Sequence, residues 1–303
     1  MDHPQNSRRS MLMNIASMLI FGTIGIFRRY IPVSSAFLAF FRGISGSLFL
    51  MAFMALAHKN PKEKLPARTV LGLAATGALM GINWILLFEA FNHTTVAVAT
   101  LCYYMQPTIV VLLAPLLFKE KLTGKKAACA AVAVIGMILV SGVIGGNPAR
   151  PGNFRGVLLG LGAAVFYSAV IILNKRIPGV DTYQKTTVQL LAAGVVLIPY
   201  LLLTGGFNGE GFSLSAVILL LVVGLVHTGI AYVLYFGSMD GLKAQSVAIL
   251  SYIDPVSALF FSAVFLREPL SLWGIIGAVL IIGSAVFSEI RPGPAANQKE
   301  ESI

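Results

Sequence analysis

Apolar residues fill ten long stretches of the chain, and short polar gaps separate the stretches. They cover residues 11–27, 34–57, 69–91, 94–118, 126–144, 156–174, 186–204, 213–236, 244–266 and 271–289. Several are close to the roughly 20 residues that a helix needs to cross about 30 Å of hydrocarbon. They do not alternate between apolar and polar residues, so the strands of a membrane barrel do not fit. Because only helices satisfy their backbone within one segment in lipid, the pattern predicts an all-α integral membrane protein with ten transmembrane helices.

The first stretch needs a separate test, since Arg8 and Arg9 precede it as the charged start of a signal peptide would. Arg28 and Arg29 follow it directly, however, and no convincing small-residue cleavage site stands before them. We therefore expect an uncleaved first helix.

The composition supports a membrane protein and excludes a soluble one. Hydrophobic residues make up 57% of the 303 residues and charged residues only 11%, whereas soluble proteins carry about 25% charged residues. Cys102 and Cys129 both lie in apolar stretches, which favours small buried side chains with no redox role. The net charge of +10 resides in the short gaps, which does not resemble a stripe for nucleic acid.

The placement of the basic residues predicts the orientation. If each stretch crosses the membrane, successive gaps lie on opposite sides of it. Of the 22 lysines and arginines, 16 then fall on the side of the N-terminus, five fall on the other side, and Arg42 lies within a stretch. The positive-inside rule then places both termini in the cytoplasm. We expect a multi-pass protein of the cell (inner) membrane.

The two halves of the chain repeat one another. A shift of 148 residues superimposes Pro107 on Pro255, Glu120 on Glu268, Tyr104 on Tyr252, Gln106 on Asp254 and Trp84 on Tyr232. Five helices per half is an odd number, so the second half must enter the membrane in the opposite direction. We expect two inverted five-helix repeats at residues 11–144 and 154–289, with cytoplasmic tails at 1–10 and 290–303. Such repeats are typical of secondary transporters, whose substrate site lies near mid-membrane between the repeats.

Two segments resemble the closing helices of an EamA domain, namely TTVAVATLCYYMQPTIVVLLAPLLFKEKLTGKKAACAAVAVIGMILV and LKAQSVAILSYIDPVSALFFSAVFLREPLSLWGIIGAVLIIGSAV. In each, a mid-helix proline precedes a glutamate by thirteen residues and a leucine by fifteen, as in that family. Arg42, within LAFFRGISG, also resembles family members, but Val188 or Gln189 stands at its second-half position. The resemblance covers residues 11–289 and implies the drug/metabolite transporter superfamily, whose two-domain members have ten helices and mostly export small metabolites.

The repeated prolines point to a transport site. Pro107 and Pro255 cannot donate a backbone hydrogen bond, so each would kink its helix and free the carbonyl four residues earlier. Matched interruptions in the two halves are the best sequence indication of a binding site, although packing alone can also require a kink.

Asp254 is the strongest single candidate. It lies about halfway along the stretch 244–266. Burying a carboxylate at that depth of the membrane costs at least about 2.5 kcal/mol, so the side chain must face water, meet a cation or carry a proton. We expect it to bind substrate and to couple transport to protons, with a structural hydrogen bond as the alternative. Glu89 and His227 are further candidates for proton coupling, but snorkelling or an ordinary interhelical hydrogen bond also explains them. Arg42 contacts substrate or pairs structurally with Glu89 or Asp254.

Aromatic and amide side chains complete the predicted substrate site. Tyrosine and tryptophan usually collect at membrane interfaces, yet several lie near the middle of these stretches. With a carboxylate they could form a cage for an amine, or they could line packing seams. The members of this set are Asn83, Trp84, Tyr103, Tyr104, Gln106, Tyr167, Tyr232 and Tyr252.

We therefore expect a secondary transporter, namely an exporter of a small amine-containing, amino-acid-like or other polar metabolite that works by alternating access. Proton coupling is compatible with the sequence and is not required by it. Motifs of metalloproteases, nucleotide-binding loops and serine hydrolases are absent, so we expect no enzyme, no cofactor and no metal. A channel and a membrane-embedded lipid-modifying enzyme remain the alternatives. The expected partners are the solute and the lipid bilayer, with no nucleic acid, for a monomer or homodimer.

Overall fold

The computed structural model describes residues 4–58, 64–118, 123–140, 153–207, 212–239, 241–242 and 244–289, and this part of the chain is helical without strands. Glu120 and the expected tail 290–303 lie outside these residues. In chain order the helices are α1 (Pro4–Tyr30), α2 (Ser35–Leu56), α3 (Ala67–His93), α4 (Val96–Tyr103), α5 (Gln106–Phe118), α6 (Gly124–Val140), α7 (Asn153–Lys175), α8 (Thr182–Val195), α9 (Ile198–Leu203), α10 (Leu214–Val222), η1 (Val223–Ile230), α11 (Ala231–Met239), α12 (Ala244–Ser251), α13 (Ile253–Phe265) and α14 (Leu272–Glu289).

The described helices include seven that are long and apolar enough to cross a membrane. They are Arg8–Tyr30, Ser35–Leu56, Ala67–His93, Val96–Leu113, Phe154–Lys175, Thr182–Leu203 and Leu214–Met239, and two shorter apolar helices are Ile249–Phe265 and Leu272–Ser288. The stretch expected at 126–144 corresponds to α6, which has 17 described residues. The helical membrane fold is thus as expected, whereas the count of ten crossings remains a prediction. The first helix begins at Pro4, so most of the expected tail 1–10 is helical.

Prolines interrupt three of the expected stretches, because a proline offers no amide hydrogen to the preceding turn. The break at Tyr104–Met105 precedes Pro107, the break at Tyr252 precedes Pro255, and the break at Val196–Leu197 precedes Pro199. Pro107 and Pro255, the expected kink positions, each stand in the first turn of the helical segment that follows a break. In a fourth stretch the chain widens into the π-helix η1.

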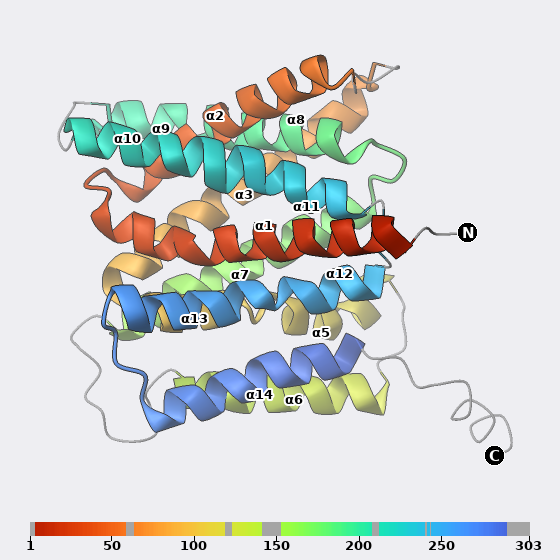
Figure 1. Cartoon of the computed structure of the whole chain (residues 1–303), viewed down its shortest axis with the longest axis vertical. Coiled ribbons are helices and arrows are strands. Elements are labelled where there is room, and N and C mark those ends of the chain that lie inside the picture. The colour runs from red at the N-terminus through yellow and green to blue at the C-terminus, as the bar shows by residue number, and fades with distance from the viewer. Residues whose placement is uncertain are drawn as a thin grey trace, which may run out of the picture.

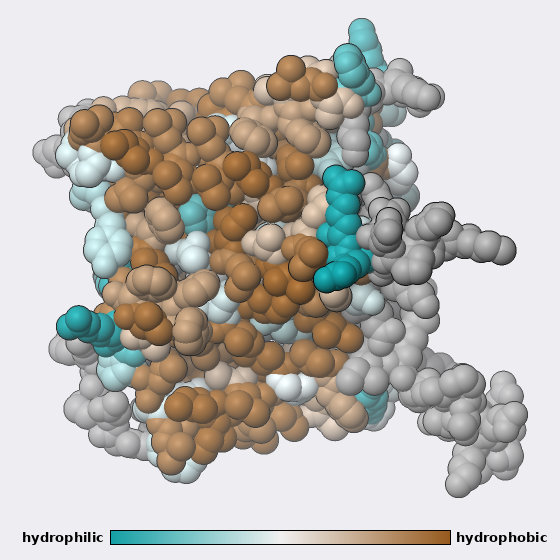
Figure 2. Space-filling view, in the orientation of Figure 1, coloured by the Kyte–Doolittle hydropathy of each residue, from teal (hydrophilic) through white to brown (hydrophobic). Residues whose placement is uncertain are grey.

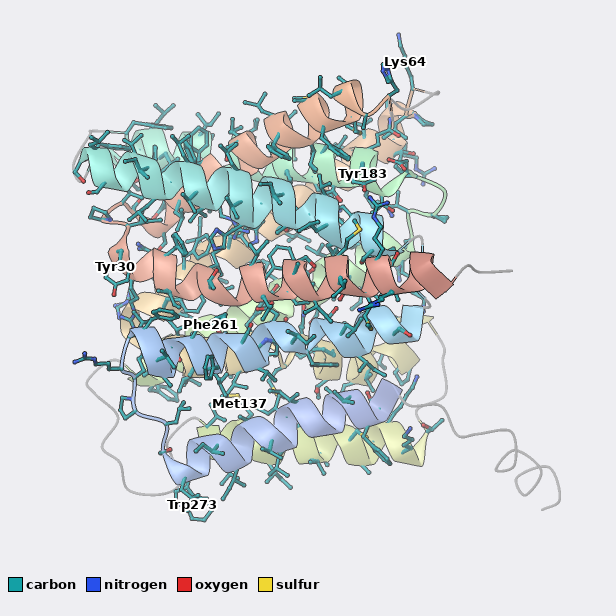
Figure 3. The ribbon with its side chains drawn as sticks, viewed as in Figure 1. Tyr30, Lys64, Met137, Tyr183, Phe261 and Trp273 are labelled. Carbon is teal, nitrogen blue, oxygen red and sulfur yellow. The ribbon has the colours of Figure 1, made fainter. Side chains whose placement is uncertain are left out.

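The helices lie side by side, so the molecule has two polar ends and an apolar middle. α1 begins and α14 ends at the same end of the bundle, which we call the N-terminal end, and Lys64 lies there too (Figures 1 and 3). Tyr30 and Trp273 lie at the opposite end (Figure 3). Apolar residues cover the middle of the visible face and hydrophilic residues gather towards both ends (Figure 2), as expected of a protein surrounded by lipid.

The packing of the helices is the same when the two halves are exchanged. α3 packs on α7, and the corresponding α11 packs on α1; α4 and α5 pack on α7, and the corresponding α12 and α13 pack on α1. α2 packs on α8, and α6 packs on α14, which are pairs of equivalent helices. In the last pair Gly136 and Gly277 face one another so closely that a Cβ on either would collide with the carbonyl oxygen of the other. This small-residue contact is a common way to bring membrane helices together.

Candidate functional site

A cavity of about 520 Å³ lies between the two halves. This volume is in the range of small-molecule sites, roughly 300–1,000 Å³. Its polar lining residues come from eight helices and two helix breaks and are Arg42, Trp84, Thr100, Tyr103, Tyr104, Gln106, Tyr167, Tyr232, Tyr235, Ser251, Tyr252 and Asp254. Both members of three repeat-related pairs, Trp84/Tyr232, Tyr104/Tyr252 and Gln106/Asp254, therefore face one space.

The breaks before Pro107 and Pro255 deliver the most polar groups to this cavity. Asp254 lies in the first turn of α13, and its Oδ2 accepts a hydrogen bond of 2.6 Å from the hydroxyl of Tyr104 at the break after α4. The same hydroxyl lies 3.4 Å from the carbonyl oxygen of Ser251, which Pro255 leaves without its helical donor. The two interrupted helices thus meet through a tyrosine of one half and a carboxyl of the other.

Aromatic rings form a nearly continuous wall around these groups. The ring of Tyr103 lies 5.8 Å from that of Tyr104 and 5.6 Å from that of Tyr167, while the rings of Tyr104 and Tyr252 are 6.3 Å apart. Tyr232 stacks on Phe236 with 5.6 Å between ring centres. Ring faces of this kind attract cations and pack against apolar groups.

Arg42 reaches the same cavity from α2. Its Nε donates to the hydroxyl of Thr228 at 3.0 Å, and its guanidinium carbon lies 4.3 Å from the ring centre of Trp84. The described residues form two ion pairs, Arg29–Glu268 and His93–Glu89, and neither includes Arg42. The alternative in which Arg42 pairs structurally with Glu89 or Asp254 is therefore wrong for this structure.

Three candidates do not line the cavity. Asn83 is fully buried, and its amide donates to the carbonyl of Ala163 at 2.6 Å, so it joins α3 to α7. Glu89 lies near the end of α3, where it accepts a hydrogen bond from Ser35 at 2.8 Å and contacts His93 at 3.1 Å. Helix geometry explains both positions, because neighbouring residues on a helix point about 100° apart.

His227 also lies outside the cavity lining. Its Nε2 is 2.8 Å from the hydroxyl of Thr23, which donates its own proton to the carbonyl of Ile20 at 2.7 Å. Its Nδ1 lies 3.4 Å from the carbonyl oxygen of Val222, so each ring nitrogen of His227 faces an oxygen atom. The ring of Phe27 packs at 4.7 Å, which leaves His227 almost fully buried in an interhelical hydrogen bond.

A polar cluster closes the bundle at the end opposite to the N-terminal end. Arg29 pairs with Glu268 at 3.1 Å and donates to the carbonyl of Thr94 at 2.6 Å, while Glu268 accepts the backbone N–H of Val96 at 2.8 Å. Glu268 thus caps α4 of the other half and not the helix that follows it, which is capped by Ser271. Burial raises the pKa of the Glu268 carboxyl, although Arg29 and the backbone amides of α4 lower it.

Sequence reasoning missed Thr100, Tyr235 and Ser251. Helical spacing could have found two of them, because Thr100 precedes Tyr104 by four residues and Tyr235 follows Tyr232 by three. Ser251 stands four residues before Pro255, so the sequence predicts that its carbonyl oxygen has no helical hydrogen-bond donor. It gave no comparable indication for the serine side chain. No cluster of three His, Cys, Asp or Glu side chains able to hold a metal occurs among the described residues.

Known proteins resemble this chain along most of its length. A family model described as the EamA-like transporter family matches residues 8–142 and 154–289. The uncharacterized transporter YxxF of Bacillus subtilis is 30% identical over 95% of this chain and 91% of its own length. A probable amino-acid metabolite efflux pump of Escherichia coli is 24% identical over 79% of this chain and 82% of its own. One crystal structure superimposes with a TM-score of 0.65 at 20% identity, over 96% of this chain and 98% of that chain, which shows a shared fold.

Proposed function

Because the chain belongs to the EamA-like transporter family and is a membrane transporter, we propose that it exports a small amine-bearing metabolite through the central cavity. The carrying observation is the carboxyl of Asp254, which faces a mid-bundle cavity walled by tyrosines. A carboxylate beside aromatic rings attracts a protonated amine more strongly than either group alone. The name of the E. coli relative, an efflux pump for an amino-acid metabolite, supports export of such a solute.

The proposed setting is the inner membrane, with ten crossings in two inverted repeats and both termini in the cytoplasm. The excess of lysine and arginine in the gaps on the N-terminal side supports this orientation. The end that carries Arg29 and Glu268 would then face outwards.

Alternating access would require that outer end to open and close. In this structure Arg29, at the end of α1, pairs with Glu268, which precedes α14. Glu268 also accepts the N–H of Val96 at the start of α4, so these contacts join the first half of the chain to the second. Close packing continues below them, since a Cβ at Gly22 of α1 would collide with the Ser257 hydroxyl of α13. We assign this arrangement to a state with a closed outer end.

Asp254 is also our candidate for proton coupling. It is the one carboxyl among the described residues that line the cavity, whereas Glu89 and His227 are engaged elsewhere. A proton and a protonated amine would compete for the same oxygen atoms. Loading of the solute would then release the proton, which is the minimum requirement for exchange.

Asp254→Asn tests this function, because asparagine keeps the size of the side chain and removes its charge. Purified protein in liposomes is assayed with labelled amino acids and amines, first by counterflow and then under a pH gradient. We expect the wild type to accumulate a solute against its gradient when a pH gradient is imposed. The variant should lose at least about tenfold of that accumulation while solute exchange persists at a reduced rate.

Glu89→Gln is the matched control, since it removes a carboxyl outside the cavity and should leave the pH response in place. Transport by Asp254→Asn with an unchanged rate and pH profile would contradict the role of Asp254. Failure of every amine-bearing solute in counterflow would contradict the proposed function itself.

A further inference from the structure

Arg42 is a buried cation without a protein counter-ion among the described residues. It is 4% exposed, and its one hydrogen bond there runs from Nε to Thr228. The faces of Trp84 and Phe88 lie 4.3 Å and 5.4 Å from its guanidinium carbon. Ring faces compensate only part of the cost of removing a guanidinium from water.

The side chain is also held in one orientation. Thr228 belongs to the π-helix η1, and its hydroxyl donates to the carbonyl of Val223 at 3.1 Å. That hydroxyl can therefore only accept from Arg42, so the Nε bond has a fixed direction. With Nε bonded to Thr228, the free edge of Arg42 is the fork of Nη1 and Nη2. This edge is the one that binds a carboxylate through two parallel hydrogen bonds.

In the same cavity, Asp254 lacks a cation among the described residues. It accepts a hydrogen bond from Tyr104, and neither of the two ion pairs in the described part of the chain includes it. Nearby, the side-chain oxygen of Gln106 is buried without a hydrogen-bond donor among the described residues. The cavity lining thus includes a guanidinium without an anion, and a carboxyl and an amide oxygen without a cation or donor, among the described residues.

From this arrangement we propose that Arg42 forms an anion subsite, so that the transported solute is a zwitterion with its acidic group on Arg42 and its amine on Asp254. This inference rests on the proposed function and narrows its substrate class. A simple amine would leave the guanidinium unpaired and would be repelled by it in a site of low dielectric constant. A zwitterion neutralises both charges, and the tyrosine wall accommodates an apolar side chain.

The test uses three matched sets of probes, each made of an amino acid, the amine without its carboxylate and the acid without its amine. The sets are leucine, 3-methylbutylamine and 4-methylpentanoate; phenylalanine, phenethylamine and 3-phenylpropionate; and tryptophan, tryptamine and indole-3-propionate. Dissociation constants are measured by calorimetry on the full chain in lipid nanodiscs. In at least one set we expect the amino acid to bind at least about tenfold more tightly than either partner.

Arg42→Gln should weaken binding of that amino acid by about 10- to 100-fold and should not weaken binding of its amine, because the repulsion by the guanidinium is removed. Thr228→Val removes the bond that orients the guanidinium and should weaken the amino acid by a smaller factor, again without weakening the amine. Arg42→Lys keeps the charge and should recover part of the loss. The amine constants show that each variant is folded.

Equal binding of amine and amino acid in all three sets, or an equal loss of both in Arg42→Gln, would overturn the anion subsite. Transport of amines in the same liposomes would leave the proposed function standing in that case. If no probe binds and none is transported, the subsite and the function both fail.

Discussion

At the scale of single residues, neighbours in the sequence take different roles. Trp84 faces the cavity beneath Arg42, whereas Asn83 points to α7 and donates to the Ala163 carbonyl. Both residues lie at the same depth in the predicted membrane span. The sequence could predict this depth but not the direction in which each side chain points. The face of the helix depends on which neighbour packs against it, and no single stretch contains that information.

Asn83→Ala should therefore affect stability and not substrate affinity. The change leaves the Ala163 carbonyl without its donor, which costs about 1 kcal/mol for hydrogen bonds between membrane helices. We expect the melting temperature to fall by about 2–4 °C and KM to stay within about twofold. Trp84→Ala is the comparison and should raise KM. An increase in KM for Asn83→Ala without loss of stability would show that this residue contacts the solute.

At the scale of helices, the interruptions could be predicted only in part. The prolines indicated where the backbone would lose hydrogen bonds, and the breaks at Tyr104–Met105 and Tyr252 follow from them. The π-helix η1 has no proline to indicate it, and its residues Thr228 and His227 contact Arg42 and Thr23, which lie far away in the sequence. Capping of α4 by Glu268 was equally hidden, since these residues are 172 positions apart.

The buried cap makes stability depend on pH in a defined direction. Because burial raises the pKa of Glu268, the packed protein holds a proton in a pH window above the ordinary pKa, where the unfolded chain has lost it. This contribution to stability is present at low pH and is lost as the pH rises through the raised pKa. Glu268→Gln removes this pH-dependent contribution. Across that pH window the melting temperature of the variant should therefore fall by about 2 °C less than that of the wild type. Parallel curves of melting temperature against pH for both proteins would exclude this effect.

At the scale of the whole molecule, the repeat was the most informative feature of the sequence. The shift that superimposes Pro107 on Pro255 also relates helices whose packing is equivalent, such as α3 on α7 and α11 on α1. The alignment could not give the contacts themselves, since they depend on how the two halves interlock. It nevertheless indicated which residue pairs would face one cavity.

The proposed orientation predicts which end is accessible from outside the cell. Tyr30 is 60% exposed at the end opposite to the N-terminal end, and Lys64 is exposed at the N-terminal end. A cysteine at position 30 should react with a membrane-impermeant thiol reagent in intact cells, and one at position 64 only after permeabilisation. The parent protein is the control, because Cys102 and Cys129 are buried. Reaction at position 64 in intact cells would reverse the orientation.

The coexistence of one guanidinium and one carboxyl in the cavity has an electrical consequence. A zwitterion carries no net charge, so its exchange for one proton on Asp254 would move one elementary charge across the membrane in each cycle. A potential of 100 mV, negative inside, would contribute about 2.3 kcal/mol to that cycle. At about 1.4 kcal/mol per factor of ten, this voltage alone could sustain a roughly 50-fold outward concentration ratio of solute.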